Sequence, residues 1–181
     1  MGRVLSEPLF SRVLGAGAFA ALPATLRALH SIDGRRTWAG RADISRGDHP
    51  LVAPCAWLAR LPPAATAVPV EVTFVTDAQG ERWQRRFGRH RMPSRLWARG
   101  SELRERLGAL SFAFLLTTTG DEIHWRVRRV SAFGLLPLPR RWFGQVHCRE
   151  REHAGRYEFR VEVALPLLGP FIRYEGWLEP R

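Results

Sequence analysis

Residues 81–116 alternate between apolar and polar side chains in four consecutive short segments, and no other feature constrains the fold as strongly. Alternate side chains of a strand lie on opposite faces. Trp83, Arg85 and Phe87 therefore share one face of the first segment. The apolar faces of the next three segments hold Met92, Ser94 and Leu96, then Leu103, Glu105 and Leu107, then Leu110, Phe112, Phe114 and Leu116. Strands joined by such short turns predict antiparallel neighbours.

The alternation extends over most of the chain. An earlier strand is predicted at Thr37 to Ser45, and later alternating sets contain Val72, Trp125, Cys148, Val161 and Tyr174. We therefore expect about ten mostly antiparallel strands, in a β-rich body over residues 37–179 of one α+β domain, 1–181. Such a sheet closes into a barrel with a calycin-like layout or curves around a helix as a helix-grip sheet. The barrel is favoured because the chain ends in a strand.

Two helical regions are predicted beside these strands. Residues 7–30 have helical spacing, with Ser6 as a cap and with Gly15, Gly17 and Pro23 dividing the region into two helices. Asp48 is expected to cap a further helix between the first and second strands. The apolar residues assigned to that helix are Leu51, Val52, Cys55, Leu58 and Ala59.

The charge of the chain favours no single function. The net charge is +11, and all 28 basic residues are arginine, as expected of a coding sequence rich in G and C. The arginines are scattered among glutamates, and no nucleic-acid-reading motif accompanies them. An arginine-rich nucleic-acid binder is therefore kept only as an alternative, and a solvated basic surface is favoured.

Metal sites, cofactors and membrane spans are not predicted. Cys55 and Cys148 lie far apart, and the six histidines have no ligand spacing. No apolar run reaches the roughly 18–20 residues that cross a bilayer. Arg3 and the segment VLGAGAFAALPA resemble a signal peptide, but Glu7 and Arg12 interrupt the pattern. A bacterial cytoplasmic protein is the favoured interpretation.

Five polar residues, each on a different strand, fall on apolar faces: Arg85, Ser94, Glu105, Glu150 and Tyr174. Buried polar groups require partners. In one interpretation Arg85 and Glu105 form a buried ion pair joined by Tyr174, which fixes the strand register. In the other these residues hold the polar end of a hydrophobic small molecule, in a cavity of about 300 Å³ or more. The candidate ligand-binding residues are Trp83, Arg85, Ser94, Glu105, Trp125, Glu150 and Tyr174.

Two further alternatives follow from the polar and aromatic residues. Glu105 and Glu150 are the pair of carboxyl groups available for acid/base catalysis, so an enzyme remains an alternative, with no catalytic residue assigned. The connection from Ser131 to Gly144 is unusually apolar for a loop. Its Trp142 and Phe143 are candidates for a lid, a docking patch or a membrane-touching loop, unless they fold back onto the core.

Several segments resemble a bacterial domain-of-unknown-function family, number 4166. They are LFSRVLG with ALPATLRALH, GRADISRG, ERWQRRFG followed by Ser94, RERLGALSFAFLL and, most specifically, FRVEVALPLLGPFIRYEGWLEP. The resemblance implies a domain found alone or C-terminal to a saccharopine-dehydrogenase-like part, and hence a possible dehydrogenase-like partner. It implies no activity and no catalytic residues. This chain has no GxGxxG after a strand, so dehydrogenase chemistry would require another chain.

Overall fold

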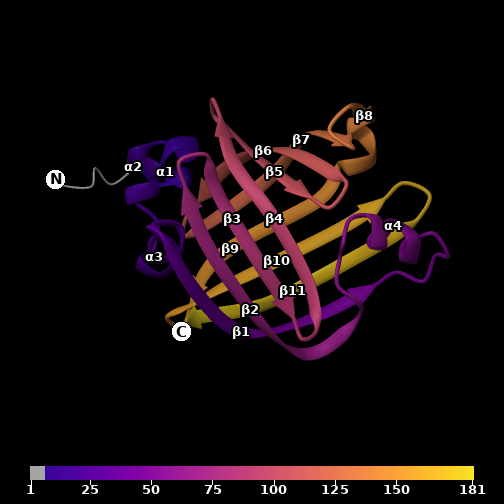
Figure 1. Cartoon of the computed structure of the whole chain (residues 1–181), viewed down its shortest axis with the longest axis horizontal. Helices are drawn as coiled ribbons and strands as arrows, with labels where there is room; N and C mark the ends of the chain where they lie inside the picture. The colour runs from indigo at the N-terminus through magenta and orange to yellow at the C-terminus, as the bar shows by residue number, and fades with distance from the viewer. Residues whose placement is uncertain (1–6) are drawn as a thin grey trace.

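The computed structural model describes residues 7–181, in which ten strands close into one antiparallel barrel (Figure 1). The strands are β1 (Arg35–Arg46), β2 (Ala65–Asp77), β3 (Gly80–Phe87), β4 (His90–Arg99), β5 (Glu102–Leu107), β6 (Leu110–Thr119), β7 (Glu122–Ala132), β8 (Leu136–Leu138), β9 (Gln145–His153), β10 (Arg156–Leu165) and β11 (Gly169–Pro180). Strands β1 to β7 follow in chain order, then β9, β10 and β11, which pairs with β1. The predicted α+β barrel is confirmed.

The strand pairing places the predicted inward residues on one side of the wall. Trp83 lies opposite Ser94, and Leu96 lies opposite Glu105, so the four-segment pattern forms one continuous inner face. The three-residue β8 was not predicted. It pairs with β7 outside the closed ring, and it is followed by a 3-10 helix, η1 (Arg140–Phe143).

Three short helices close one end of the barrel, which we call the helical end. They are α1 (Leu9–Leu14), α2 (Ala16–Ala20) and α3 (Ala24–His30). The prediction of two helices was wrong, because the chain turns at Gly15, with φ 89°, and again at Pro23. The predicted cap, Ser6, lies outside the described residues.

A fourth helix, α4 (Val52–Leu58), lies between β1 and β2 at the other end, as predicted. Asp48 does not cap it: the helix follows a turn at Leu51 in which the His49 ring accepts the Leu51 N–H, and no side chain caps the helix. The predicted apolar face was also wrong in part. Val52, Ala56 and Ala59 are buried, whereas Leu51, Cys55 and Leu58 are exposed because only one narrow face of the helix meets the barrel.

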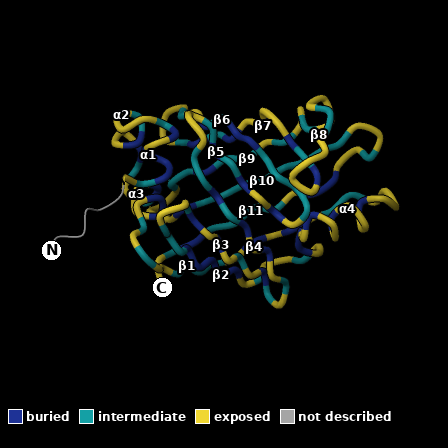
Figure 2. The backbone as a smooth tube through the Cα atoms, turned by 45° about the horizontal axis from the view of Figure 1, so that its top comes forward, coloured by how far each residue is buried: buried dark blue, intermediate teal, exposed yellow. Residues whose placement is uncertain are grey.

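The other end of the barrel is formed by α4, the 133–144 connection and the turn at 166–168, and we call it the loop end (Figure 1). The helical end is densely packed around Phe10, Leu26 and Leu103, all of which are fully buried. By contrast, most of β10 is only partly buried along its length (Figure 2), including the inward residues Phe159 and Val163. The core residues at the helical end are therefore more fully buried than the inward side chains of β10.

Candidate functional site: the barrel interior

A cavity of about 90 Å³ lies inside the barrel, walled by apolar and aromatic side chains. Six of the seven predicted ligand-binding residues line it: Trp83, Arg85, Glu105, Trp125, Glu150 and Tyr174. The seventh, Ser94, is buried beside them and bonded to Arg85. The cavity is smaller than the expected 300 Å³, because inward aromatic side chains and the helices α1–α3 occupy much of the interior. Small-molecule sites usually measure about 300–1,000 Å³.

Arg85 is held by three neighbours within the barrel wall. Its guanidinium donates from Nη1 to Ser94 Oγ at 2.7 Å and from Nη2 to Glu105 Oε1 at 3.1 Å. It also lies 4.6 Å from the centre of the Trp83 ring, in a cation–π arrangement. Only 13% of the Arg85 side chain and 9% of the Glu105 side chain are exposed. The predicted buried ion pair is therefore present.

Tyr174 is not part of this ion pair. Its ring packs against Phe87 at 5.8 Å and Phe159 at 6.3 Å between centroids. Burial raises the pKa of the Tyr174 hydroxyl, which keeps it protonated at neutral pH. Tyr174 thus borders the cavity as a neutral, mainly aromatic wall.

A second polar cluster connects the barrel to the helices α1–α3 at the helical end. His30, at the end of α3, lies with Nε2 2.7 Å from Glu150 Oε2, and its ring stacks on Phe10 at 3.6 Å. Beside them, burial and then the charge of Glu150 raise the pKa of Tyr157. The sequence indicated Glu150 but not His30. The available signal was that His30 follows Leu26 at helical spacing and so belongs to the same apolar face.

Glu81 is a further buried acid that alternation should have identified. It precedes Trp83 by two residues and therefore shares its inward face, and Glu81 Oε2 accepts the Trp83 Nε1–H at 2.7 Å. Glu81 was not predicted to face inward, because it lies at the start of the strand beside a turn, where charged residues are usually exposed. Burial raises the pKa of Glu81, and the Trp83 hydrogen bond offsets this only in part.

Replacing Glu81 with glutamine is expected to become more stabilising, relative to the wild type, as pH rises above 4.5. As pH rises from 4.5 towards the raised pKa, the unfolded chain ionises Glu81 freely while the folded chain keeps it protonated, which favours the unfolded state. The wild type therefore loses stability relative to the variant, by up to about 1.4 kcal/mol per pH unit in that interval. Urea unfolding at several pH values measures this difference. A constant difference would contradict the assigned burial of Glu81.

Cys148 faces the cavity near both inward acids. Burial, followed by the charges of Glu105 and Glu150, raises the pKa of its thiol. The cysteines are free, and Cys55 is exposed on α4. The two thiols therefore occupy opposite environments, one inside the barrel and one on its surface.

We expect native protein to react rapidly with a thiol reagent such as DTNB at Cys55 alone. Cys148 should react at least about a hundredfold more slowly, because the thiolate is the reactive form and a raised pKa depletes it. Stopped-flow labelling of wild type, Cys55→Ser and Cys148→Ser assigns the two rates. A fast rate that persists in Cys55→Ser would place the Cys148 thiol in a more exposed and polar environment.

One hydrogen-bond donor at the cavity wall has no partner. Among the described residues, Trp125 Nε1 is buried without an acceptor, although Trp125 lines the cavity and is only 6% exposed. A buried polar group without a partner is costly. An acceptor atom inside the cavity would remove that cost.

Glu105 and Glu150 both line the cavity, but each is bonded to a different partner. Glu105 accepts from Arg85, and Glu150 lies against His30. They do not form a hydrogen-bonded carboxyl pair. Within residues 7–181, no group of three His, Cys, Asp or Glu side chains gathers as metal ligands, and no helix is long and apolar enough to cross a membrane.

The aromatic pair predicted as a lid divides between two environments. Phe143 is partly buried and packs edge-on against Phe112 at 6.3 Å, whereas Trp142 is exposed. Their helix, η1, packs against β7 and β10, beside the place where the β7–β9 pairing stops at Arg126 and His147. The segment thus covers the side of the barrel where β7 and β9 no longer pair.

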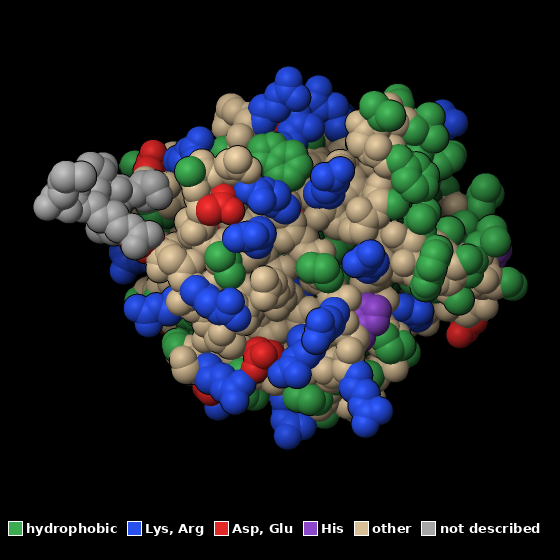
Figure 3. All heavy atoms as spheres, viewed as in Figure 1, with side chains coloured by type: hydrophobic (Ala, Val, Ile, Leu, Met, Phe, Trp, Pro, Cys, Tyr) green, Lys and Arg blue, Asp and Glu red, His purple; other side chains and the backbone are tan. Residues whose placement is uncertain are grey.

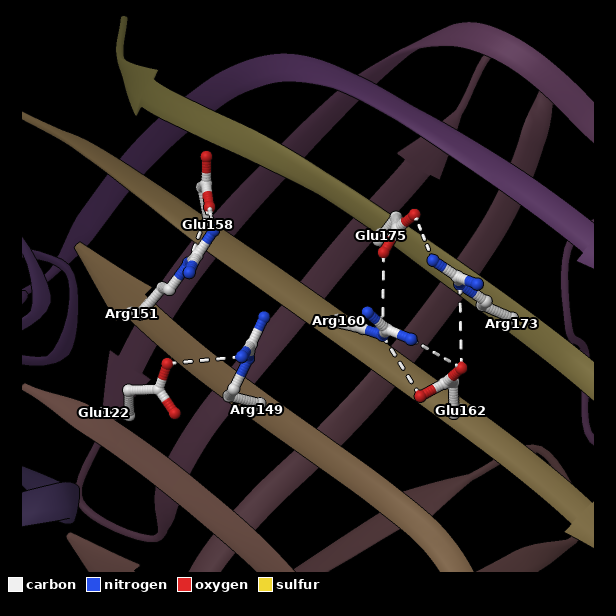
Figure 4. A network of polar contacts seen from close by, with 8 residues as sticks. All are labelled: Glu122, Arg149, Arg151, Glu158, Arg160, Glu162, Arg173 and Glu175. Atoms are coloured by element: carbon white, nitrogen blue, oxygen red, sulfur yellow. Dashed lines mark hydrogen bonds and ion pairs between the residues drawn. The ribbon is translucent and has the colours of Figure 1, made fainter. Parts of the chain in front are cut away.

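The outer surface carries two different charge patterns. On β9, β10 and β11 arginines alternate with glutamates, as in the Arg160–Glu162 pair at 2.8 Å and the Arg173–Glu175 pair at 2.6 Å (Figure 4). The face formed by β3 and β4 is dominated by arginine (Figure 3). Its outward basic residues are Arg82, Arg86, Arg91, Arg95 and Arg99. The polar residues of the cavity are separated from both surfaces by the barrel wall.

Comparison with known proteins gives a family and a distant structure. Residues 22–178 match the family described as "Domain of unknown function (DUF4166)". No curated protein matches the chain. The crystal structure of Rv2717c from M. tuberculosis is 13% identical, with a TM-score of 0.45, and the match covers 88% of this chain and 99% of that one.

Proposed function

Since the chain belongs to the DUF4166 family, whose function is unknown, we propose from the barrel itself that it binds a small, uncharged and mainly apolar molecule that carries a hydroxyl group. The apolar and aromatic wall would hold the body of the molecule. The inward polar residues would hold its hydroxyl. This refines the sequence hypothesis, in which Arg85 and Tyr174 held the polar end.

The observation that carries this proposal is the chemistry of the inward polar groups. The charge of Arg85 is already paired with Glu105, and its guanidinium also donates to Ser94, so it offers little net charge to a ligand carboxylate. Glu105 and Glu150 both border the cavity and would repel an anion. The unpaired Trp125 Nε1–H requires an acceptor. A hydroxyl group both donates and accepts, and so suits carboxyl oxygens and an indole N–H together.

Partly buried apolar side chains beyond the cavity support a ligand that is longer than the cavity. Inward side chains of β9 and β10 between the cavity and the loop end, such as Val146, Val163 and Leu165, are only partly buried. An apolar tail along these side chains would remove further apolar surface from water, at roughly 25 cal/mol per Å². The hydroxyl would then lie at the cavity and the tail would extend towards the loop end.

Native mass spectrometry of gently purified protein, followed by solvent extraction, tests for such a ligand. Val161→Phe, which fills the cavity wall, should lower retention at least tenfold. Val75→Phe, on the outer side of β2, is the matched control and should retain the ligand. Equal retention by both variants, or an extracted molecule that is anionic, would overturn the proposal.

The remaining alternatives have direct tests. An enzyme using Glu105 predicts a turnover that Glu105→Gln abolishes without unfolding the protein. A dehydrogenase-like partner predicts co-purification from cells, and a nucleic-acid binder predicts retention that falls steeply with added salt. The cavity chemistry favours binding over catalysis and over nucleic-acid binding, and a dehydrogenase-like partner would be compatible with it.

A further inference from the structure

The exposed large apolar side chains gather at one end of the molecule. Among residues 7–181 there are eight, and all lie in the connections of the loop end, where Figure 3 shows apolar surface on the right. They are Leu51, Trp57, Leu58, Phe133, Leu135, Leu136, Trp142 and Leu167. Trp57 is 79% exposed, Leu135 is 89% exposed and Leu167 is 96% exposed. Three segments far apart in the sequence therefore each present an apolar side chain to solvent.

The turns at the helical end have the opposite character. They consist of Ala78-Gln79, Gly100-Ser101, Gly120-Asp121 and Ala154-Gly155, which are the small and polar residues typical of hairpin turns. The hairpin turns of the helical end are thus small and polar, whereas the loop end combines two short turns, at 88–89 and 108–109, with longer apolar connections. Burial in the fold does not explain the apolar loops, because their side chains remain exposed.

The charge at the loop end is positive. Its connecting segments carry four arginines, Arg60, Arg89, Arg140 and Arg141, and one acidic residue, Asp48. All four arginines are exposed, and none forms an ion pair with a described residue. On the outer face of β9–β11, by contrast, arginines are paired with neighbouring glutamates (Figure 4). The loop end therefore attracts an anionic partner.

We propose that the loop end docks on the surface of an anionic lipid bilayer. Tryptophan, phenylalanine and leucine are the side chains that insert at the boundary between headgroups and acyl chains, and arginine binds anionic headgroups. Nucleic acid fits less well, because leucine side chains do not stack on bases. The apolar side chains project from three separate segments instead of lining one groove, which suits a deformable lipid surface.

Docking in this way would place the loop end of the barrel against the lipid. Trp57 on α4, Leu135 before β8 and Leu167 after β10 would insert together, with Arg140 and Arg141 at the headgroups. The inference stands without the proposed ligand, because it rests on the outer surface alone. A failure to bind any small molecule would leave it unchanged.

Co-sedimentation with vesicles tests the proposal, using phosphatidylcholine with and without phosphatidylglycerol. The wild type should bind the anionic vesicles at least tenfold more tightly than the neutral ones, and binding should weaken with salt. The triple variant Trp57→Ser/Leu135→Ser/Leu167→Ser should lose at least tenfold in affinity. These side chains are exposed, so folding should be retained.

Charge reversal at the two ends provides the matched comparison. Arg140→Glu/Arg141→Glu should lower affinity for anionic vesicles at least tenfold, whereas Arg12→Glu/Arg99→Glu at the helical end should leave it within about threefold. Equal losses from both pairs would overturn the proposal. So would retention on single-stranded RNA without vesicle binding, or a dimer that the triple apolar variant dissociates in the absence of vesicle binding.

Discussion

Replacing Arg85 with methionine is expected to lower the free energy of unfolding by about 3–5 kcal/mol, the usual cost of removing one partner from a buried ion pair. Methionine fills similar volume but leaves Glu105 without its donor and removes the cation over Trp83. The hydrogen bond to Ser94 is lost as well. Urea unfolding at neutral pH, followed by tryptophan fluorescence, measures the change.

Two controls separate the ion pair from a general effect of removing arginine. Arg86 is next in sequence, points outward and pairs with Glu71 at the surface, so Arg86→Met should cost less than about 1 kcal/mol. The double variant Arg85→Met/Glu105→Leu should recover most of the lost stability, because no charge is then buried without a partner. Equal effects of Arg85→Met and Arg86→Met would contradict the buried pair.

Replacing His30 with alanine is expected to cost about 3 kcal/mol or more, because it removes the partner of Glu150 and leaves a cavity against Phe10. His30 is completely buried and lies at the contact between α3 and the barrel. Hydrogen exchange should therefore accelerate in α1–α3 more than in the strands that are distant from α3.

His153→Ala is the matched control for this variant. His153 lies at the end of β9, three residues beyond Glu150, and is exposed, so its replacement should change stability by less than about 0.5 kcal/mol. His30→Gln should be intermediate, since an amide can still donate to Glu150. If His30→Ala changed the free energy of unfolding as little as His153→Ala, the attachment of α1–α3 to the barrel would not depend on this contact.

The fold could be predicted because its main determinant is local. A side-chain period of two fixes which residues of a strand face inward, and the turns at Gly88 and Gly108 fix which strands pair. Arg85 and Glu105 could therefore be placed on one inner face before their contact was known. Their ion pair was one of two interpretations that the sequence left open, since β4 lies between β3 and β5 and alternation does not show that the two side chains meet.

What could not be predicted depends on contacts between distant segments. His30 and Glu150 are separated by 120 positions and belong to a helix and a strand, so no shared periodicity relates them. The cavity volume depends on how closely Trp83, Trp125 and Phe10 pack, and alternation carries no such information. The short β8 could not be predicted, because its own sequence, LPL, has little strand character and it forms a strand only by pairing with β7.

The charge preference of the cavity tests the proposed function most directly. Calorimetric titration with 1-octanol and with octanoate compares the same apolar tail with a hydroxyl and with a carboxylate. We expect the alcohol to bind at least about tenfold more tightly at neutral pH, and Val161→Phe to abolish the binding. Tighter binding of octanoate, or binding of neither compound, would contradict a cavity built for an uncharged, hydroxyl-bearing ligand.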